Sequence, residues 1–214
     1  MELKLDGWTC RLRPASAAPV RLLVMLHGWK GDESSMWAVA AHMPEEYTVL
    51  TPRAPYPERE SGYTWRATNP VPWKPVTLEE LREVAGSLMR FLDLWAEENR
   101  VPVGPVEAAG FSQGAALAYA IALLYPDRVK RFAALSGFLP EGSREVLASP
   151  RIRGMQGFVA HGRQDEVIPV ERAREDVSRL QEAGVEITYC ESDSGHRAGR
   201  QCLRAMEAFF GRVI

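Results

Sequence analysis

Residues 106–125 read VEAAGFSQGAALAYAIALLY, and this stretch contains the features that decide the fold. Its first part, Val106 to Phe111, is short and apolar except for Glu107, and it predicts a buried strand. Gln113 to Tyr125 form an uninterrupted apolar stretch that predicts a helix, which Pro126 ends. A buried strand that leads directly into an apolar helix is typical of a parallel sheet with helices packed on it.

Strands and helices alternate on both sides of this segment. Further strands are predicted at Leu22–Leu26, Tyr47–Thr51, Arg131–Leu135, Gly157–Ala160 and Val185–Cys190, and further helices from Ser34 or Ser35 to His42 and at 77–99, 170–183 and 198–210. Thr77 with Glu80 three residues later predicts a capping box. We therefore predict one α/β domain over residues 1–214, with a mostly parallel central sheet and helices on both faces. The segments 52–75 and 137–156 have no assigned structure, and neither is long enough for a separate cap domain.

The turn between the central strand and helix carries a G-x-S-x-G pentapeptide, Gly110 to Gly114, with Ser112 in the middle. A tight turn at this place strains the serine backbone and needs glycine on both sides, and the following helix directs its N-terminal amides at the serine. Ser112 is therefore the predicted nucleophile. The alternative is a glycine-rich turn with an idle serine.

A serine nucleophile needs a histidine base, and the chain has four histidines. His27 and His161 follow strands in His-Gly pairs, and His42 belongs to an early helix. With a G-x-S-x-G nucleophile in such a fold, the partners follow along the chain in the order Ser, Asp or Glu, His, each after a later strand. Only His196 comes late enough, between the last strand and the last helix. His196 is the predicted base, and the alternative is a histidine in a surface loop.

The base in turn needs an orienting acid, and Asp165 follows the strand at Gly157–Ala160 within a short turn. Glu166 is the main competitor, although the two neighbours cannot both point inward. Asp193 is too close in sequence to His196 to reach round its ring. The other interpretation of Asp165 is a turn-forming or helix-capping aspartate.

Two backbone N–H groups are expected to stabilise the negative charge that develops on the attacked carbonyl oxygen. The first is the N–H of Gln113, directly after the nucleophile. The second is expected in the turn after the strand at Leu22–Leu26, and we assign it to Trp29. His27, in the same turn, is predicted to be structural.

Five stretches together resemble the phospholipase/carboxylesterase group of α/β-hydrolases, which includes the acyl-protein thioesterases. They are LHGWKGDESS, GFSQGAALAYA, RVKRFAALSGFLP, HGRQDEVIPVERA and SGH, in order from about Leu22 to His196. The resemblance implies the α/β-hydrolase fold with a sheet of about eight strands, no metal or organic cofactor, and Ser112, Asp165 and His196 as the catalytic triad. Lys30 departs from the group, in which many members have a smaller residue.

The resemblance also implies a shallow acyl groove near the segment 52–75. Within it, Trp65 and Trp73 could offer apolar surface to the substrate, and Arg66 could meet a polar or anionic part. Equally, these side chains could simply pack the segment onto the sheet.

Charge and composition restrict the partners. With 26 Lys+Arg against 28 Asp+Glu the net charge is −2, so no bulk field attracts nucleic acid or an anionic membrane. We expect a cytoplasmic protein with no stable membrane insertion, a small ester or acyl substrate, and compatibility with a homodimer. The three cysteines, Cys10, Cys190 and Cys202, are expected to be reduced thiols without a metal.

The sequence thus predicts a serine hydrolase that cleaves carboxylic esters, with thioesters as a further class, through an acyl-enzyme on Ser112. Two other functions remain open. One is a small-molecule receptor that uses the hydrolase fold without useful turnover, and the other is a lactone or peptide hydrolase.

Overall fold

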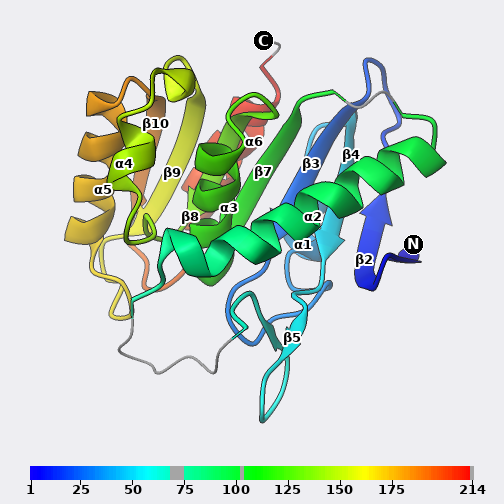
Figure 1. Ribbon diagram of the computed structural model, residues 1–214. Helices are drawn as coiled ribbons and strands as arrows, with labels where there is room; N and C mark the ends of the chain where they lie inside the picture. Colours follow the sequence, from blue (N-terminus) through cyan, green and yellow to red (C-terminus); the bar gives the residue numbers. More distant parts are fainter. Residues whose placement is uncertain (68–74, 102–103, 213–214) are drawn as a thin grey trace.

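The computed structural model describes residues 1–67, 75–101 and 104–212, and within them the central feature is an eight-stranded sheet (Figure 1). The strand order is β1-β2-β4-β3-β7-β8-β9-β10. The strands are β1 Glu2–Leu5, β2 Trp8–Arg13, β3 Arg21–Leu26, β4 Tyr47–Pro52, β7 Val106–Phe111, β8 Val129–Leu135, β9 Gln156–Gly162 and β10 Glu186–Ser192. All neighbours from β4 to β10 are parallel, and β1–β2 and β2–β4 are antiparallel. The predicted mostly parallel α/β fold is therefore confirmed.

Helices cover both faces of the sheet (Figure 1). One face carries α2 Leu78–Glu98, α3 Gln113–Leu124 and α5 Val170–Glu182, and the other carries α1 Trp37–Ala40 and α6 Arg200–Phe210. Strand β3 shows why two cores form. Val24 and Leu26 belong to the core under α2 and α3, while Leu23 and Met25 belong to the core under α6. Since successive strand side chains point to opposite faces, an all-apolar strand needs cover on both.

Two helices on the first face have clear sequence determinants. Helix α2 begins with the predicted capping box: the Glu80 N–H donates to Thr77 Oγ1 (3.1 Å), and the Thr77 N–H donates to the Glu80 carboxylate (3.1 Å). Helix α3 is buried from Gln113 to Leu123, which explains why it is apolar on every side. No helix in the described ranges is long and apolar enough to cross a bilayer.

Three local predictions need correction. The helix expected from Ser34 or Ser35 to His42 is only α1, because the Asp32 carboxylate accepts bonds from the Ser34 N–H (2.9 Å) and Ser35 Oγ (3.1 Å) and holds both serines in a turn. Strands β1 and β2, the first two of the sheet, were not predicted, since short half-polar strands give a weak periodic signal. The unassigned segments contain structure too: β5 Tyr56–Pro57 pairs with β6 Tyr63–Thr64, while α4 Arg144–Leu147 and a 3₁₀ turn at Pro150–Ile152 come later in the chain.

The prediction of three reduced thiols was wrong, because Cys190 and Cys202 form a disulfide. Cys190 lies on β10 and Cys202 on α6, so the bond joins the last strand to the last helix. The two residues are 12 positions apart, a spacing that does not reveal which side chains the fold brings together. Cys10 is free and buried, and burial raises the pKa of its thiol to about 12.

Removing the disulfide is expected to destabilise the protein. Replacing both Cys190 and Cys202 with alanine should lower the free energy of unfolding by about 3 kcal/mol, the value typical for a closed loop of this size. Urea denaturation of the double variant and of the wild type, each with and without a dithiol reductant, measures this. Cys10→Ala is the matched control, and its stability should still respond to reductant. Equal stability of the double variant and the oxidised wild type would contradict the prediction.

Candidate active site

Ser112 occupies a tight turn between the end of β7 and the start of α3. Its backbone has φ 53° and ψ −116°, a conformation that non-glycine residues rarely adopt. The flanking glycines permit close approach: a Cβ on Gly110 would lie 2.1 Å from the Gly114 carbonyl oxygen, and one on Gly114 would lie 2.3 Å from the Leu26 carbonyl oxygen. The G-x-S-x-G pattern is therefore explained by sterics, and it presents Ser112 at the carboxyl edge of the sheet.

The structure brings the three predicted triad residues together at this edge. His196 Nε2 lies 2.9 Å from Ser112 Oγ, and His196 Nδ1 lies 2.8 Å from Asp165 Oδ2. Asp165 follows β9 and His196 follows β10, so parallel neighbouring strands deliver both to the same edge as Ser112. The resulting chain from hydroxyl to imidazole to carboxylate has the geometry that activates a serine nucleophile.

Asp165 is held as an ionised acceptor. Burial raises its pKa, but hydrogen bonds from the Ile168 N–H (2.9 Å), from His196 and from the Val167 N–H (2.9 Å) outweigh burial, and the pKa lies below its usual value. Because the carboxylate can only accept, the proton that it shares with His196 belongs on Nδ1. Nε2 is then free to accept the Ser112 proton. Glu166, the competing acid, is exposed, and the position beside His196 Nδ1 is taken by Asp165.

His161 supports the acid loop, a role that the sequence reasoning did not assign. Its ring is fully buried, and Nε2 donates to the Ile168 carbonyl (2.8 Å) and lies 3.3 Å from Asp165 Oδ2. The only sequence signal was a His-Gly pair directly after a strand.

His27 has the structural role that was predicted. Its Nε2 accepts from the Ala54 N–H (3.0 Å), which leaves the proton on Nδ1 to donate to the Gly28 carbonyl (2.7 Å). Burial lowers the pKa of His27, although the Gly28 carbonyl opposes this, so the ring is kept neutral.

The turn proposed to hold the second oxyanion donor lies beside the nucleophile. A Cβ on Gly28 would lie 3.4 Å from Ser112 Cβ. The Gly31 N–H donates to the Gly28 carbonyl (3.0 Å) and closes the turn around Trp29. Within the residues that the structure describes, the N–H groups of Trp29 and Gln113 donate to no backbone carbonyl. Both groups are therefore available to a ligand, although their roles stay predictions.

Trp65 and Arg66 do not contribute a groove surface. Trp65 is fully buried, its indole donates to the His27 carbonyl (2.7 Å), and its ring stacks against Trp8. Arg66 is 4% exposed and donates to both carboxylate oxygens of Glu80 (3.1 and 3.2 Å). For these two residues the structure favours packing over substrate contact, since a large aromatic side chain such as Trp65 fixes the segment by burying much apolar surface against the sheet. Trp73 lies outside the described residues.

Exposed apolar side chains come instead from the site's own turns. Trp29 is 48% exposed, and its indole is fixed by a 2.7 Å bond to Glu58, while Val167 beside the acid is 67% exposed. Large exposed apolar side chains near a reactive group are candidates for contact with an acyl chain.

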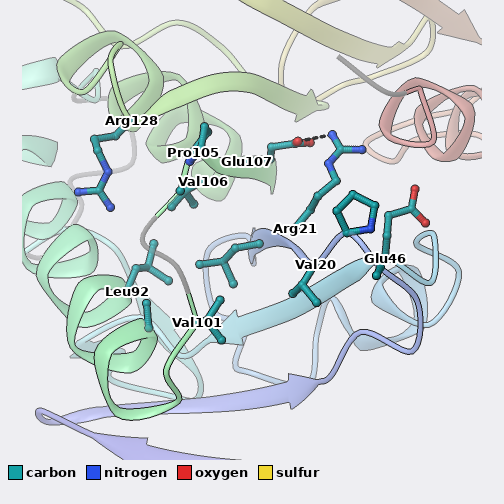
Figure 2. A pocket seen from close by; sticks show the side chains of 14 residues that line it. Val20, Arg21, Glu46, Leu92, Val101, Pro105, Val106, Glu107 and Arg128 are labelled. Atoms are coloured by element: carbon teal, nitrogen blue, oxygen red, sulfur yellow. Dashed lines mark hydrogen bonds and ion pairs between the residues drawn. The ribbon is translucent and has the colours of Figure 1, made fainter.

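A cavity of about 520 Å³ lies elsewhere, around the starts of β3 and β7 and against α2 (Figure 2). No triad residue lines it. Its charged lining residues are Arg21, Glu46, Glu107 and Arg128. Arg21 pairs with Glu107, which also accepts from the Tyr47 hydroxyl (2.6 Å), and Arg128 pairs with Asp93. We assign the cavity no role.

Comparison with known proteins agrees with this fold. The chain is 28% identical to acyl-protein thioesterase 1 of Mycosarcoma maydis over 96% of this chain and 97% of that protein. A probable carboxylesterase of Oryza sativa is 33% identical over 111 residues, which are 51% of this chain and 42% of that protein. Among solved structures, carboxylesterases of Mesorhizobium loti (19% identity, 99% of both chains) and Bacillus cereus (20% identity, 96% and 94%) each superpose with a TM-score of 0.82.

The solved structures share the fold at low identity, and a family model adds the relationship in sequence. The phospholipase/carboxylesterase model matches residues 12–214, nearly the whole chain. The chain therefore belongs to the phospholipase/carboxylesterase family.

Proposed function

We propose that the protein is a serine hydrolase that cleaves carboxylic esters and thioesters of small molecules through an acyl-enzyme on Ser112. The observation that carries this proposal is the continuous hydrogen-bonded path from Ser112 Oγ through His196 to the carboxylate of Asp165. The exposed Trp29 and Val167 are proposed to contact the acyl chain or leaving group. Membership of an esterase and thioesterase family supports the same reaction class.

Acylation follows from the positions of these groups. Ser112 Oγ attacks the carbonyl carbon while its proton passes to His196 Nε2, and the carbonyl oxygen becomes an oxyanion that accepts from the Trp29 and Gln113 N–H groups. The intermediate then collapses, the bond to the leaving oxygen or sulfur breaks, and the proton on Nε2 passes to that atom. Asp165 stabilises the imidazolium and does not itself take the proton.

Deacylation reverses the roles of the nucleophile and the leaving group. Water attacks the acyl carbon of the ester on Ser112 and gives a proton to His196 Nε2. When the second tetrahedral intermediate collapses, Ser112 Oγ leaves and recovers that proton, which releases the carboxylic acid. Each cycle consumes one water and requires no other reactant.

Intact-mass labelling with an alkyl fluorophosphonate tests the proposal. An activated serine displaces fluoride from phosphorus, so the wild type is expected to gain one phosphonyl group and Ser112→Ala none. Ser178→Ala, which alters an exposed serine on α5, is the control and should label like the wild type. A folded wild type that gains no label would refute the hydrolase and favour the binding protein. Matched ester and thioester panels then define the leaving group.

A further inference from the structure

Residues 63–65 contact both parts of the chain that are proposed to stabilise the oxyanion. Tyr63 pairs with the oxyanion turn through an isolated antiparallel bridge: the Lys30 N–H donates to the Tyr63 carbonyl (3.0 Å), and the Tyr63 N–H donates to the Gly31 carbonyl (2.9 Å). These bonds lie directly after Trp29 in the chain. The turn is therefore fixed on its far side by the β5–β6 hairpin.

The next residue reaches the other donor. Thr64 is 3% exposed, and its Oγ1 accepts from Gln113 Nε2 (2.9 Å) and lies 3.1 Å from Gln113 Oε1. The Trp65 N–H donates to the same Oε1 (3.0 Å). The side-chain amide of Gln113 is thus satisfied by two consecutive residues, although a glutamine at a helix start could equally have pointed into solvent.

Two further contacts press this segment onto the turn. The Trp65 indole donates to the carbonyl of His27, at the near side of the turn (2.7 Å). Gly62 has φ 76°, and a Cβ there would lie 2.0 Å from the Lys30 carbonyl oxygen, so the hairpin backbone touches the turn where only glycine fits.

We propose that Tyr63–Trp65, called the clamp, is a positioning segment that sets the separation of the Trp29 and Gln113 N–H groups. The hydrogen bond between Thr64 and Gln113 is the contact through which the clamp positions the Gln113 N–H. The inference rests on the proposed function, since it concerns the oxyanion of that reaction. An oxyanion hole is most effective when both donors are fixed before the reaction, because fixed dipoles need no reorganisation as charge develops. The clamp joins the two donors through a path that bypasses the nucleophile and the triad.

Thr64→Val tests this link, since valine keeps the shape of threonine and removes the hydroxyl. We expect kcat for p-nitrophenyl butyrate to fall about 10- to 100-fold, because losing one oxyanion donor costs about 10²–10³ and here a donor is only displaced. KM should stay within about twofold, because the oxyanion forms in the transition state and not in the bound ester. The inhibition constant of an alkyl trifluoromethyl ketone, whose adduct with serine carries an oxyanion, should rise by the same factor as kcat falls.

Two further variants separate positioning from general destabilisation. Thr64→Ser restores the hydroxyl and should recover most of kcat and of the ketone affinity. Thr48 lies on β4, away from the clamp, and its buried hydroxyl accepts from the Ala15 N–H (3.2 Å). Thr48→Val removes this hydroxyl and should affect thermal stability without changing kcat. If Thr64→Val does not fold, Gln113→Met breaks the same link from the other side while it keeps the backbone donor.

The outcomes distinguish this inference from the proposed function. A wild type without turnover and without a fluorophosphonate adduct rejects the function itself. A wild type that is active and labels, with unchanged kcat in Thr64→Val or Gln113→Met, rejects only the clamp. Equal losses in Thr64→Ser and Thr64→Val also reject it, because the hydroxyl would then not be the group responsible.

Discussion

Ser112→Ala is expected to lower kcat by about 10⁴- to 10⁶-fold with little effect on folding. The variant loses only the oxygen that lies 2.9 Å from His196 Nε2, and the Cβ and the strained backbone of the turn remain. No other group in the described part of the site is placed to attack the same carbonyl. Steady-state hydrolysis of p-nitrophenyl butyrate by the two proteins measures the loss.

The interpretation of this result depends on two controls. Thermal unfolding of Ser112→Ala should match that of the wild type to within a few degrees, since no buried hydrogen bond outside the catalytic path is removed. Ser178→Ala should retain full turnover. Activity that persists in Ser112→Ala after repeated purification would contradict the acyl-enzyme mechanism on Ser112.

Asp165→Asn is expected to lower kcat by about 10⁴-fold, for a reason specific to this loop. Oδ1 of Asp165 accepts from the N–H groups of Val167 and Ile168, so the carbonyl oxygen of an asparagine must take that position. Its NH₂ then faces His196 Nδ1 and donates to it. The histidine proton is forced onto Nε2, which can no longer accept from Ser112. Single-turnover and steady-state hydrolysis by the folded variant measure the effect.

Glu166→Gln is the matched control for this variant, because the neighbouring carboxyl is exposed and competes with Asp165 for the same assignment in the sequence. It should retain wild-type turnover. If instead Glu166→Gln is inactive and Asp165→Asn is active, the assignment of the acid is reversed.

The fold could be predicted because its strongest signals are local. The strand at Val106–Phe111 is apolar except for Glu107, the helix after it is a nearly continuous apolar stretch, and Pro126 marks the end. Strands β1 and β2 lack such signals, since each alternates between more and less buried residues over only a few positions. Strand β2 is placed in the sheet by pairing with β4, a contact between segments far apart in the chain, and β1 is placed by pairing with β2.

The candidate site likewise contains residues that local signals predict and contacts that depend on distant segments. Ser112, Asp165 and His196 could be proposed because each comes shortly after a predicted strand, and the carboxyl ends of parallel strands meet at one edge of the sheet. The buried position of Trp65 depends on Trp8 and His27, which are distant in sequence. The disulfide and the bond between Thr64 and Gln113 are likewise tertiary contacts. No periodicity along the chain encodes them, so the sequence left the role of Trp65 open between substrate contact and packing and led to the wrong state for Cys190 and Cys202.

The backbone of Ser112 places stability and activity in opposition at a single position. Its φ of 53° is maintained by the Ser112 N–H, which donates to the Leu135 carbonyl (2.9 Å), and by the Ser112 carbonyl, which accepts from Ala115 (3.0 Å). Such a conformation costs about 1–3 kcal/mol in a residue with a Cβ, and glycine would largely avoid that cost. Selection for heat tolerance alone would therefore favour glycine at position 112 and discard the nucleophile, so thermostable variants of this protein have to be sought under simultaneous selection for turnover.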